Sequence, residues 1–189
     1  VFLVDDNFIG NKRNVKLLLP LLRQWQIEHG FPFSFATEAS VDLAADDDLM
    51  QMMVECRFES VFLGIETPDE ASLETAGKLQ NTRSSLVDSV DKITSYGLRV
   101  MAGFIIGFDG EKEGAGGRIV EFVTRTGIPH AMMGMLQALP NTALWHRLEK
   151  EGRLIEGKAA AKGVNQTNLL NFEPTRPIRD IANEYVDAF

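Results

Sequence analysis

The sequence is poor in cysteine, with Cys56 as the single example among 189 residues. One cysteine cannot close a disulfide within the chain, and it cannot supply the three or four thiolates that bind an iron–sulfur cluster or a structural zinc ion. A cysteine-based metal site within this chain is therefore excluded. We expect Cys56 to be a small buried apolar residue near a helix end, and the lack of disulfides fits a cytoplasmic location.

Long apolar runs and an excess of positive charge are also missing. No apolar run reaches the roughly 20 residues that a membrane-spanning helix needs, so no transmembrane segment is expected. The formal net charge of −8 disfavours an extended surface for nucleic acid or anionic lipid. The chain opens on a strand-like run without the basic segment of a secretory signal and without an initiator methionine, so we expect it to be cut from a longer protein.

What the sequence does contain is an alternation of strand-like and helix-like segments. Strands are predicted at residues 1–4, 31–35, 60–65, 99–107 and 130–139. Helices are predicted at residues 14–29, 46–56, 69–76, 83–96, 119–126, 141–152 and 177–189. Because the strands are too apolar for a half-exposed sheet, they predict a parallel α/β fold, either a barrel with fewer than eight units or an open wound sheet. We expect residues 1–155 to form this core, and residues 156–189 to form a C-terminal extension that begins within a loop at 157–171.

Several local patterns favour structural roles. The first helix is expected to be kinked by Pro20 and to pack through an apolar face made of Leu17, Leu18, Leu21, Leu22 and Trp25. The three aspartates at 46–48 are typical of a helix start, where negative charge is favourable, rather than of a metal site. The glycine-rich residues 114–118 lack the lysine of a phosphate-binding loop and predict a flexible turn. Asn141 is the expected N-cap of the helix that follows it.

Polar or small residues gather where the predicted strands end. In parallel α/β folds the carboxyl ends of the strands meet at one edge, where the functional site lies. Carboxylates there suit a ligand with an ammonium group and a ribose diol, and glycines let a flat ring approach the backbone. For each carboxylate, capping a helix or pairing with an arginine is the alternative. The residues at these ends are Asp5, Asp6, Asn7, Thr37, Glu38, Ser40, Glu66, Thr67, Gly103, Gly107, Asp109, Gln137, Pro140 and Asn141.

Five segments, taken in order, carry a resemblance to a known family. They are VFLVDDNFIGN at 1–11, TEAS at 37–40, FLGIETP at 62–68, GFIIGFD at 103–109 and MLQALPNT at 135–142. Together they resemble strands two to six of the radical S-adenosylmethionine (SAM) enzymes that carry a cobalamin-binding domain, in the subgroup that includes hopanoid methylases. The family often has an acidic residue three places after the second glycine of the fifth-strand pattern. Here Gly110 stands at that place, and Glu111 follows it.

The resemblance implies a SAM pocket at the carboxyl ends of the strands of a partial TIM-type (β/α) barrel. Asp5, Asp6 and Asn7 would hold the methionine amino group, and Glu38 and Glu66 would contact the methionine part or the ribose. Gly103, Ile105 and Gly107 would flank the adenine, whose edge would meet backbone groups of Leu136, Gln137 and Ala138. Ser40 and Thr67 complete the expected binding set, in which no residue is assigned a catalytic or metal-binding role.

The resemblance also implies cofactors that this chain cannot hold. The family binds a [4Fe–4S] cluster on a three-cysteine loop after its first strand, a segment that precedes the part matched here, and cobalamin on a separate domain. We therefore expect a segment that is inactive alone, within a parent enzyme that transfers a methyl group by radical chemistry to a small or lipid-like substrate. The exposed edge of the first strand is expected to allow dimerisation.

Two other functions remain open on the sequence. A catalytically inactive α/β module could bind a nucleoside-like ligand or a protein partner, since the cysteines are missing. Alternatively, a metal-free barrel enzyme could use Glu38 or Glu66 as a general base, which would require a closed apolar pocket and a raised pKa for that carboxyl group.

Overall fold

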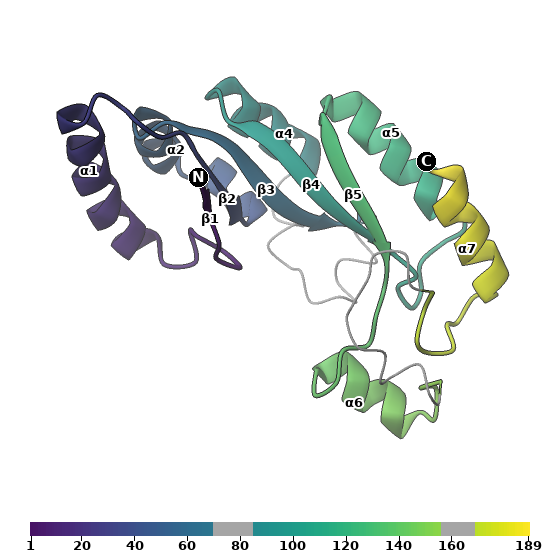
Figure 1. The fold of residues 1–189 in the computed structure, drawn as a ribbon. Helices are drawn as coiled ribbons and strands as arrows, with labels where there is room; N and C mark the ends of the chain where they lie inside the picture. Colours follow the sequence, from purple (N-terminus) through teal and green to yellow (C-terminus); the bar gives the residue numbers. More distant parts are fainter. Residues whose placement is uncertain (70–84, 156–168) are drawn as a thin grey trace. The chain divides into compact units, whose positions relative to one another are not determined.

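A computed structural model describes residues 1–69, 85–155 and 169–189. Within them the chain forms a five-stranded parallel sheet in the order β1-β2-β3-β4-β5 (Figure 1). The strands are β1 (Phe2–Leu3), β2 (Phe35–Ala39), β3 (Phe58–Glu66), β4 (Arg99–Ile106) and β5 (His130–Met135). The predicted parallel α/β fold is thus confirmed, with strands in sequence order as in a partial barrel.

Helices separate the strands. They are α1 (Lys12–Glu28), the short 3-10 helix η1 (Val41–Ala45), α2 (Asp47–Glu55), α4 (Leu86–Ser95), α5 (Ala115–Thr126), α6 (Ala143–Lys150) and α7 (Ile178–Asp187). Asp46 caps α2 by accepting a hydrogen bond from the Leu49 amide, which confirms that the acidic triplet starts a helix. The predicted helix at 69–76 and most of the predicted loop at 157–171 lie outside the described residues. None of the described helices is both long and apolar enough to cross a membrane.

Four local predictions were wrong in detail. The second strand begins at Phe35 rather than ending there, so Thr37 and Glu38 lie within it. β5 ends at Met135, four residues early. The glycine-rich turn is in fact the start of α5, because an acidic side chain from α7 caps it, as described below. Thr142, not Asn141, caps α6 by accepting from the Trp145 amide.

Helix α1 packs through a different face from the one predicted. Leu17, Leu18, Leu21 and Trp25 are exposed, whereas Val15, Leu19 and Gln26 are buried. The buried positions follow a spacing of four and seven residues, so they form their own stripe along the helix. Gln26 is tolerated inside because its Nε2 donates to the carbonyls of Phe33 (2.7 Å) and Cys56 (3.1 Å). The helix is continuous through Pro20.

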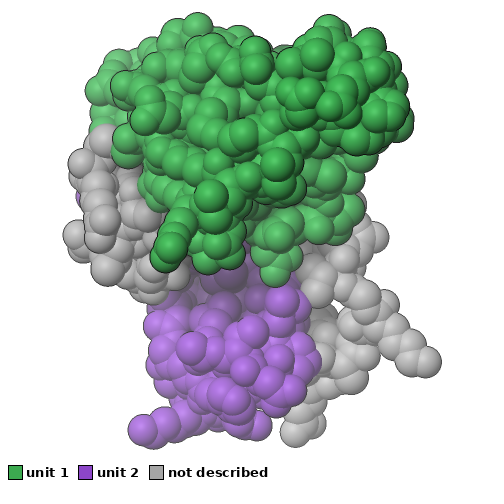
Figure 2. All heavy atoms as spheres, turned by 90° about the vertical axis from the view of Figure 1, so that its left-hand side faces the viewer, with its two compact units in different colours: residues 1–65, 79–103, 122–131 green, residues 66–78, 104–121, 132–189 purple. Residues whose placement is uncertain are grey.

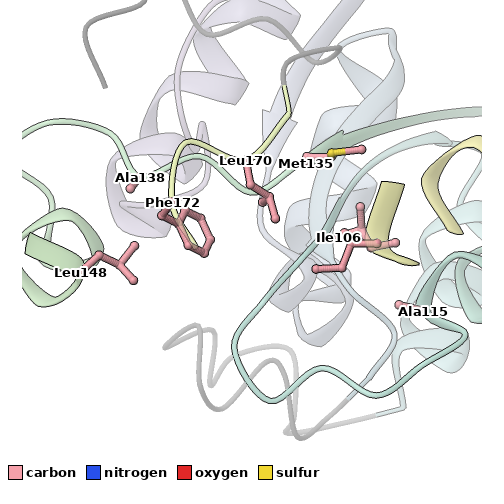
Figure 3. Packing of buried hydrophobic residues seen from close by; sticks show 8 residues of the cluster. Ile106, Ala115, Met135, Ala138, Leu148, Leu170 and Phe172 are labelled. Atoms are coloured by element: carbon pink, nitrogen blue, oxygen red, sulfur yellow. The ribbon is translucent and has the colours of Figure 1, made fainter. Parts of the chain in front are cut away.

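The described residues divide into two compact units, coloured separately in Figure 2. One comprises the described residues within 1–65, 79–103 and 122–131, and the other comprises the described residues within 66–78, 104–121 and 132–189. The second unit has a core that joins the end of β4, the first turn of α5 and the C-terminal segment (Figure 3). Ile106, Leu170 and Phe172 are fully buried in this core. The predicted boundary at residue 155 remains a prediction.

Candidate functional site

Three strands place predicted ligand-binding residues on the less buried of their two faces. Along β3 from Val61 onward, and along β4 from Val100 onward, every second residue is almost fully buried, including Leu63, Phe104 and Ile106. The residues between them are half-buried. The predicted site residues Glu38, Glu66, Gly103 and Ile105 all belong to this half-buried set.

Within the first unit, Phe62 joins two of these positions. Its partner in the register of β2 and β3 is Glu38. A Cβ atom added at Gly103 would lie 2.9 Å from the Phe62 ring. Gly103 is therefore needed to accommodate an aromatic ring that belongs to the chain itself. The glycine predicted the approach of a flat ring, but no feature of the sequence singled out Phe62.

The loop after β1 is tied to the end of β2 by the predicted residues Asn7 and Ser40. The Asn7 side-chain Nδ2 donates to Ser40 Oγ (3.1 Å), and the Ser40 backbone amide donates to Asn7 Oδ1 (3.1 Å). Asp5 and Asp6 are exposed, and Asp5 accepts a hydrogen bond from the Asn7 amide (2.9 Å). Asn7 and Ser40 thus shape the loop, while the two aspartates face solvent.

Within the second unit, Glu66 ends β3 in a strained conformation. Its φ of +68° lies in the left-handed region, which non-glycine residues seldom adopt. Such strain tends to persist at functional sites, so Glu66 is a candidate on conformational grounds as well. The next residue, Thr67, is buried, and its Oγ1 accepts from the Asp69 amide (3.2 Å). Asp69 in turn forms an ion pair with Arg118 (2.9 Å).

Gly107 marks the turn after β4, where only glycine fits. Its φ is +103°, and an added Cβ would lie 3.0 Å from a methyl carbon of Leu170. Its amide donates to Glu111 Oε2 (2.9 Å). The acidic residue that follows the fifth-strand pattern one place late therefore reaches the backbone of the second glycine.

Glu111 is a buried carboxylate that sequence reasoning noted but did not place in the site. It is 3% exposed, and its Oε1 has no hydrogen-bond partner among the residues that the structure describes. Burial raises its pKa to about 7, against the opposing effects of the Gly107 amide and the Arg176 guanidinium. Arg176 Nη1 lies 3.5 Å from Glu111 Oε2. The sequence signal that could have identified Glu111 was its position, one place beyond the acidic residue of the family pattern.

The predicted segment 136–138 makes its contacts within the second unit. The buried side chain of Asn171 donates to the Ala138 carbonyl (2.9 Å) and accepts from the Ala138 amide (2.8 Å). The Leu136 amide donates to the Ile106 carbonyl (2.9 Å), which extends the pairing of β4 with β5. The Gln137 side chain donates to the Leu169 carbonyl (3.0 Å). The contact of these residues with adenine remains a prediction.

Asp109, another strand-end residue, is an ion-pair partner in the structure. It accepts two hydrogen bonds from Arg153 (2.7 and 2.9 Å) and one from Arg147 (2.8 Å). The hydrogen bonds from Arg153 hold the pKa of Asp109 below its ordinary value. For this residue the alternative of pairing with arginine is the correct one.

The residues of this chain do not fit an iron–sulfur cluster. Cys56 is fully buried, its Sγ donates to the Leu19 carbonyl (3.1 Å), and burial raises its pKa to about 11. A cluster takes thiolate ligands from several cysteines, whereas this single thiol is buried and already donates to a backbone carbonyl. Among residues 1–69, 85–155 and 169–189, no three His, Cys, Asp or Glu side chains gather as a metal site would require.

A parallel α/β segment with polar residues at its strand ends is typical of part of a (β/α) barrel. Comparison with known proteins identifies which barrel proteins the chain resembles. A family model described as a domain of unknown function (DUF4070) matches residues 142–189. The chain is 69% identical over its full length to 35% of an uncharacterized methyltransferase, sll1242, from Synechocystis. It is 40% identical, over 82% of its length, to 29% of the hopanoid C-2 methylase of Rhodopseudomonas palustris.

The fold also matches a solved structure. With a TM-score of 0.64 and 14% identity, 85% of the chain superimposes on 31% of the radical SAM methyltransferase TsrM from Kitasatospora setae, solved with cobalamin and a [4Fe–4S] cluster. The chain is thus homologous to a segment of the hopanoid C-2 methylase and has the fold of a partial radical SAM core. Both findings confirm the resemblance that the sequence motifs indicated. It spans about a third of the length of these relatives.

Proposed function

We propose that this chain is the SAM-binding segment of a longer cobalamin-dependent radical SAM methyltransferase and that it is inactive alone. The observation that carries the proposal is that predicted ligand-binding residues occupy half-buried strand positions in each unit, Glu38 and Gly103 in the first and Glu66 and Ile105 in the second. These positions lie in or near the carboxyl-terminal halves of their strands, where parallel α/β folds bind ligands.

The chemistry of these groups suits SAM. Carboxylates of Glu38, Glu66 and the exposed Asp5 and Asp6 match an ammonium group and ribose hydroxyls. Backbone amides and apolar side chains at the end of β4 match the flat adenine. A polyphosphate ligand is disfavoured, since these predicted side chains are acidic or neutral.

The remaining cofactors would be held by other parts of the parent protein. When bound there, the cluster supplies the electron that cleaves SAM, and cobalamin carries the methyl group. The chain's own contribution would be to bind and orient SAM. Because relatives of this chain include a hopanoid methylase, a lipid-like substrate is proposed for the parent.

The proposal is tested on the intact protein, purified without oxygen and reconstituted with iron and sulfide, beside residues 1–189 alone. We expect about four irons per intact chain and release of 5′-deoxyadenosine from SAM on reduction, with neither for the segment. S-adenosylhomocysteine should bind the intact protein in calorimetry. An intact protein that binds neither the cluster nor S-adenosylhomocysteine would leave a non-catalytic module as the better account.

The residue assignment needs its own comparison. Glu38→Gln should weaken binding of S-adenosylhomocysteine, because the amide cannot neutralise an ammonium group. Glu59→Gln is the matched control, since Glu59 lies at the opposite, amino-terminal end of neighbouring β3 and is exposed. Equal affinities for the two variants would remove Glu38 from the site.

A further inference from the structure

A chain of polar contacts links the turn after β4 to the C-terminal segment. It begins at the Gly107 amide, which donates to the buried Glu111. Arg176 then approaches Glu111 Oε2 (3.5 Å) and donates to the neighbouring Lys112 carbonyl (3.1 Å). The Arg176 guanidinium therefore contacts both the Glu111 carboxylate and the Lys112 carbonyl, and it holds the turn that contains them.

The same guanidinium is fixed by Glu184 of α7. Arg176 Nη2 donates to Glu184 Oε1. Glu184 also accepts from the amides of Gly114 (2.9 Å) and Ala115 (3.0 Å) at the start of α5. Burial opposes its ionisation, but these amides and Arg176 outweigh that effect and lower the pKa of Glu184. A carboxylate at a helix N-terminus is favourable because it meets free N–H groups and the positive end of the helix dipole.

Close packing holds these groups in place. Gly116 in the first turn of α5 faces the backbone of Glu184, which leaves no room for a side chain. The first turn of α5 thus lies against α7 (Figure 1). Leu170 and Ile181 pack over Gly107. The segment 170–189 therefore contacts the turn through apolar and charged groups together.

We propose that Arg176 and Glu184 are positioning residues, which hold the Gly107 turn through Glu111 so that nucleoside binding at the end of β4 depends on the C-terminal segment. This inference rests on the proposed function. Arg176 and Glu184 both lie within residues 142–189, the part of the chain that matches the family model of unknown function. This part would therefore have a role in nucleoside binding. Arg176 would act through Glu111 rather than touch the ligand.

The test measures binding of S-adenosylhomocysteine to the intact protein by calorimetry between pH 6 and pH 8.5. Arg176→Gln should weaken binding about tenfold, the loss expected for one charged hydrogen-bonding group. Arg179→Gln is the matched control, because Arg179 is exposed on the same segment. Arg176→Lys should bind with intermediate affinity, since lysine keeps the charge but not the planar guanidinium group that contacts two partners. Thermal unfolding of each variant verifies that it is folded.

The pH profile separates positioning from general stability. Among the described residues, the charged groups that act on Glu111 are Arg176, Glu184 and Arg118. Binding to the unmodified protein should strengthen as Glu111 ionises near neutral pH, and Arg176→Gln should shift this transition to higher pH. Glu111→Gln keeps an acceptor for the Gly107 amide, so it should bind without the transition.

Two outcomes count against different claims. If the unmodified protein does not bind S-adenosylhomocysteine, the proposed function fails. If it binds, and Arg176→Gln matches Arg179→Gln in affinity and pH profile, the proposed function stands and the positioning role of Arg176 is wrong.

Discussion

Gly116 and Glu184 are in such close contact that a Cβ atom at position 116 would lie 2.3 Å from the Glu184 carbonyl oxygen. Real Cβ atoms do not come so near to a backbone atom, so α5 and α7 pack backbone against backbone here. The contact also brings the Glu184 carboxylate to the start of α5. One glycine therefore allows both the packing of the C-terminal helix and the cap of its neighbour.

This relationship predicts opposite effects for two adjacent glycines. Gly116→Ala should lower the unfolding free energy by about 1–3 kcal/mol or more, because the backbone must move apart. Gly117→Ala should be neutral or stabilising by up to about 1 kcal/mol, since no neighbour from the described part of the chain lies within 4 Å of an added Cβ atom and alanine favours a helix. Urea unfolding of both variants measures the difference, and similar values would contradict the close packing.

A second prediction concerns the ring beside Gly103. Gly103→Ala should destabilise the chain, because its Cβ would overlap the Phe62 ring. Phe62→Leu in the same chain should recover part of the loss by removing the ring edge. A double-mutant cycle by thermal unfolding measures the coupling. Additive effects of the two substitutions would show that ring and glycine do not constrain each other.

A third prediction concerns the amide of Gln26 inside α1. Gln26→Leu should lower the unfolding free energy by about 1–3 kcal/mol, because the Phe33 and Cys56 carbonyls would lose their buried donor. Gln24→Leu is the control on the same helix, where the side chain is exposed and its partner Glu28 remains hydrated. Chemical denaturation should separate the two variants clearly. A Gln26→Leu protein as stable as the control would mean that the buried carbonyls find other partners.

The sequence allowed the fold to be predicted because apolar runs and their spacing are local properties. The apolar runs that form β3 and β4 were enough to predict buried parallel strands, and the acidic triplet that begins with Asp46 was enough to predict the start of α2. The face of α1 was missed because leucines occur all round the helix, and only tertiary contacts decide which of them are buried. The start of α5 was missed because its cap comes from Glu184, about seventy residues away.

The candidate site was predicted unevenly for the same reason. Glu38 and Gly103 in the first unit, and Glu66 and Ile105 in the second, each lie at a half-buried strand position because side-chain alternation along a strand has a fixed period. Phe62 and Glu111 were not predicted, since their importance lies in contacts with the two glycines of the fifth-strand pattern. Asp109 was expected at a strand end, but its ion pairs come from Arg147 and Arg153, which no local pattern reveals.

The last prediction concerns the pH dependence of stability, which Glu111 should control. Burial raises the pKa of Glu111 from the ordinary 4.5 to about 7, so between these values the folded chain keeps a proton that the unfolded chain releases. The unfolding free energy should therefore fall as the pH rises from 4.5 to 7. Each pKa unit corresponds to on the order of 1 kcal/mol.

Glu111→Gln removes this titration, so its stability relative to the unmodified chain should increase steadily from pH 4.5 to pH 7 and then level off. Glu113→Gln is the matched control, because Glu113 is exposed two residues away and should follow the unmodified chain at every pH. Urea unfolding of the three proteins across this range gives the comparison. A constant difference between Glu111→Gln and the unmodified chain would mean that Glu111 stays ionised in the folded state. The Arg176 guanidinium and the Gly107 amide would then outweigh the cost of burying the charge.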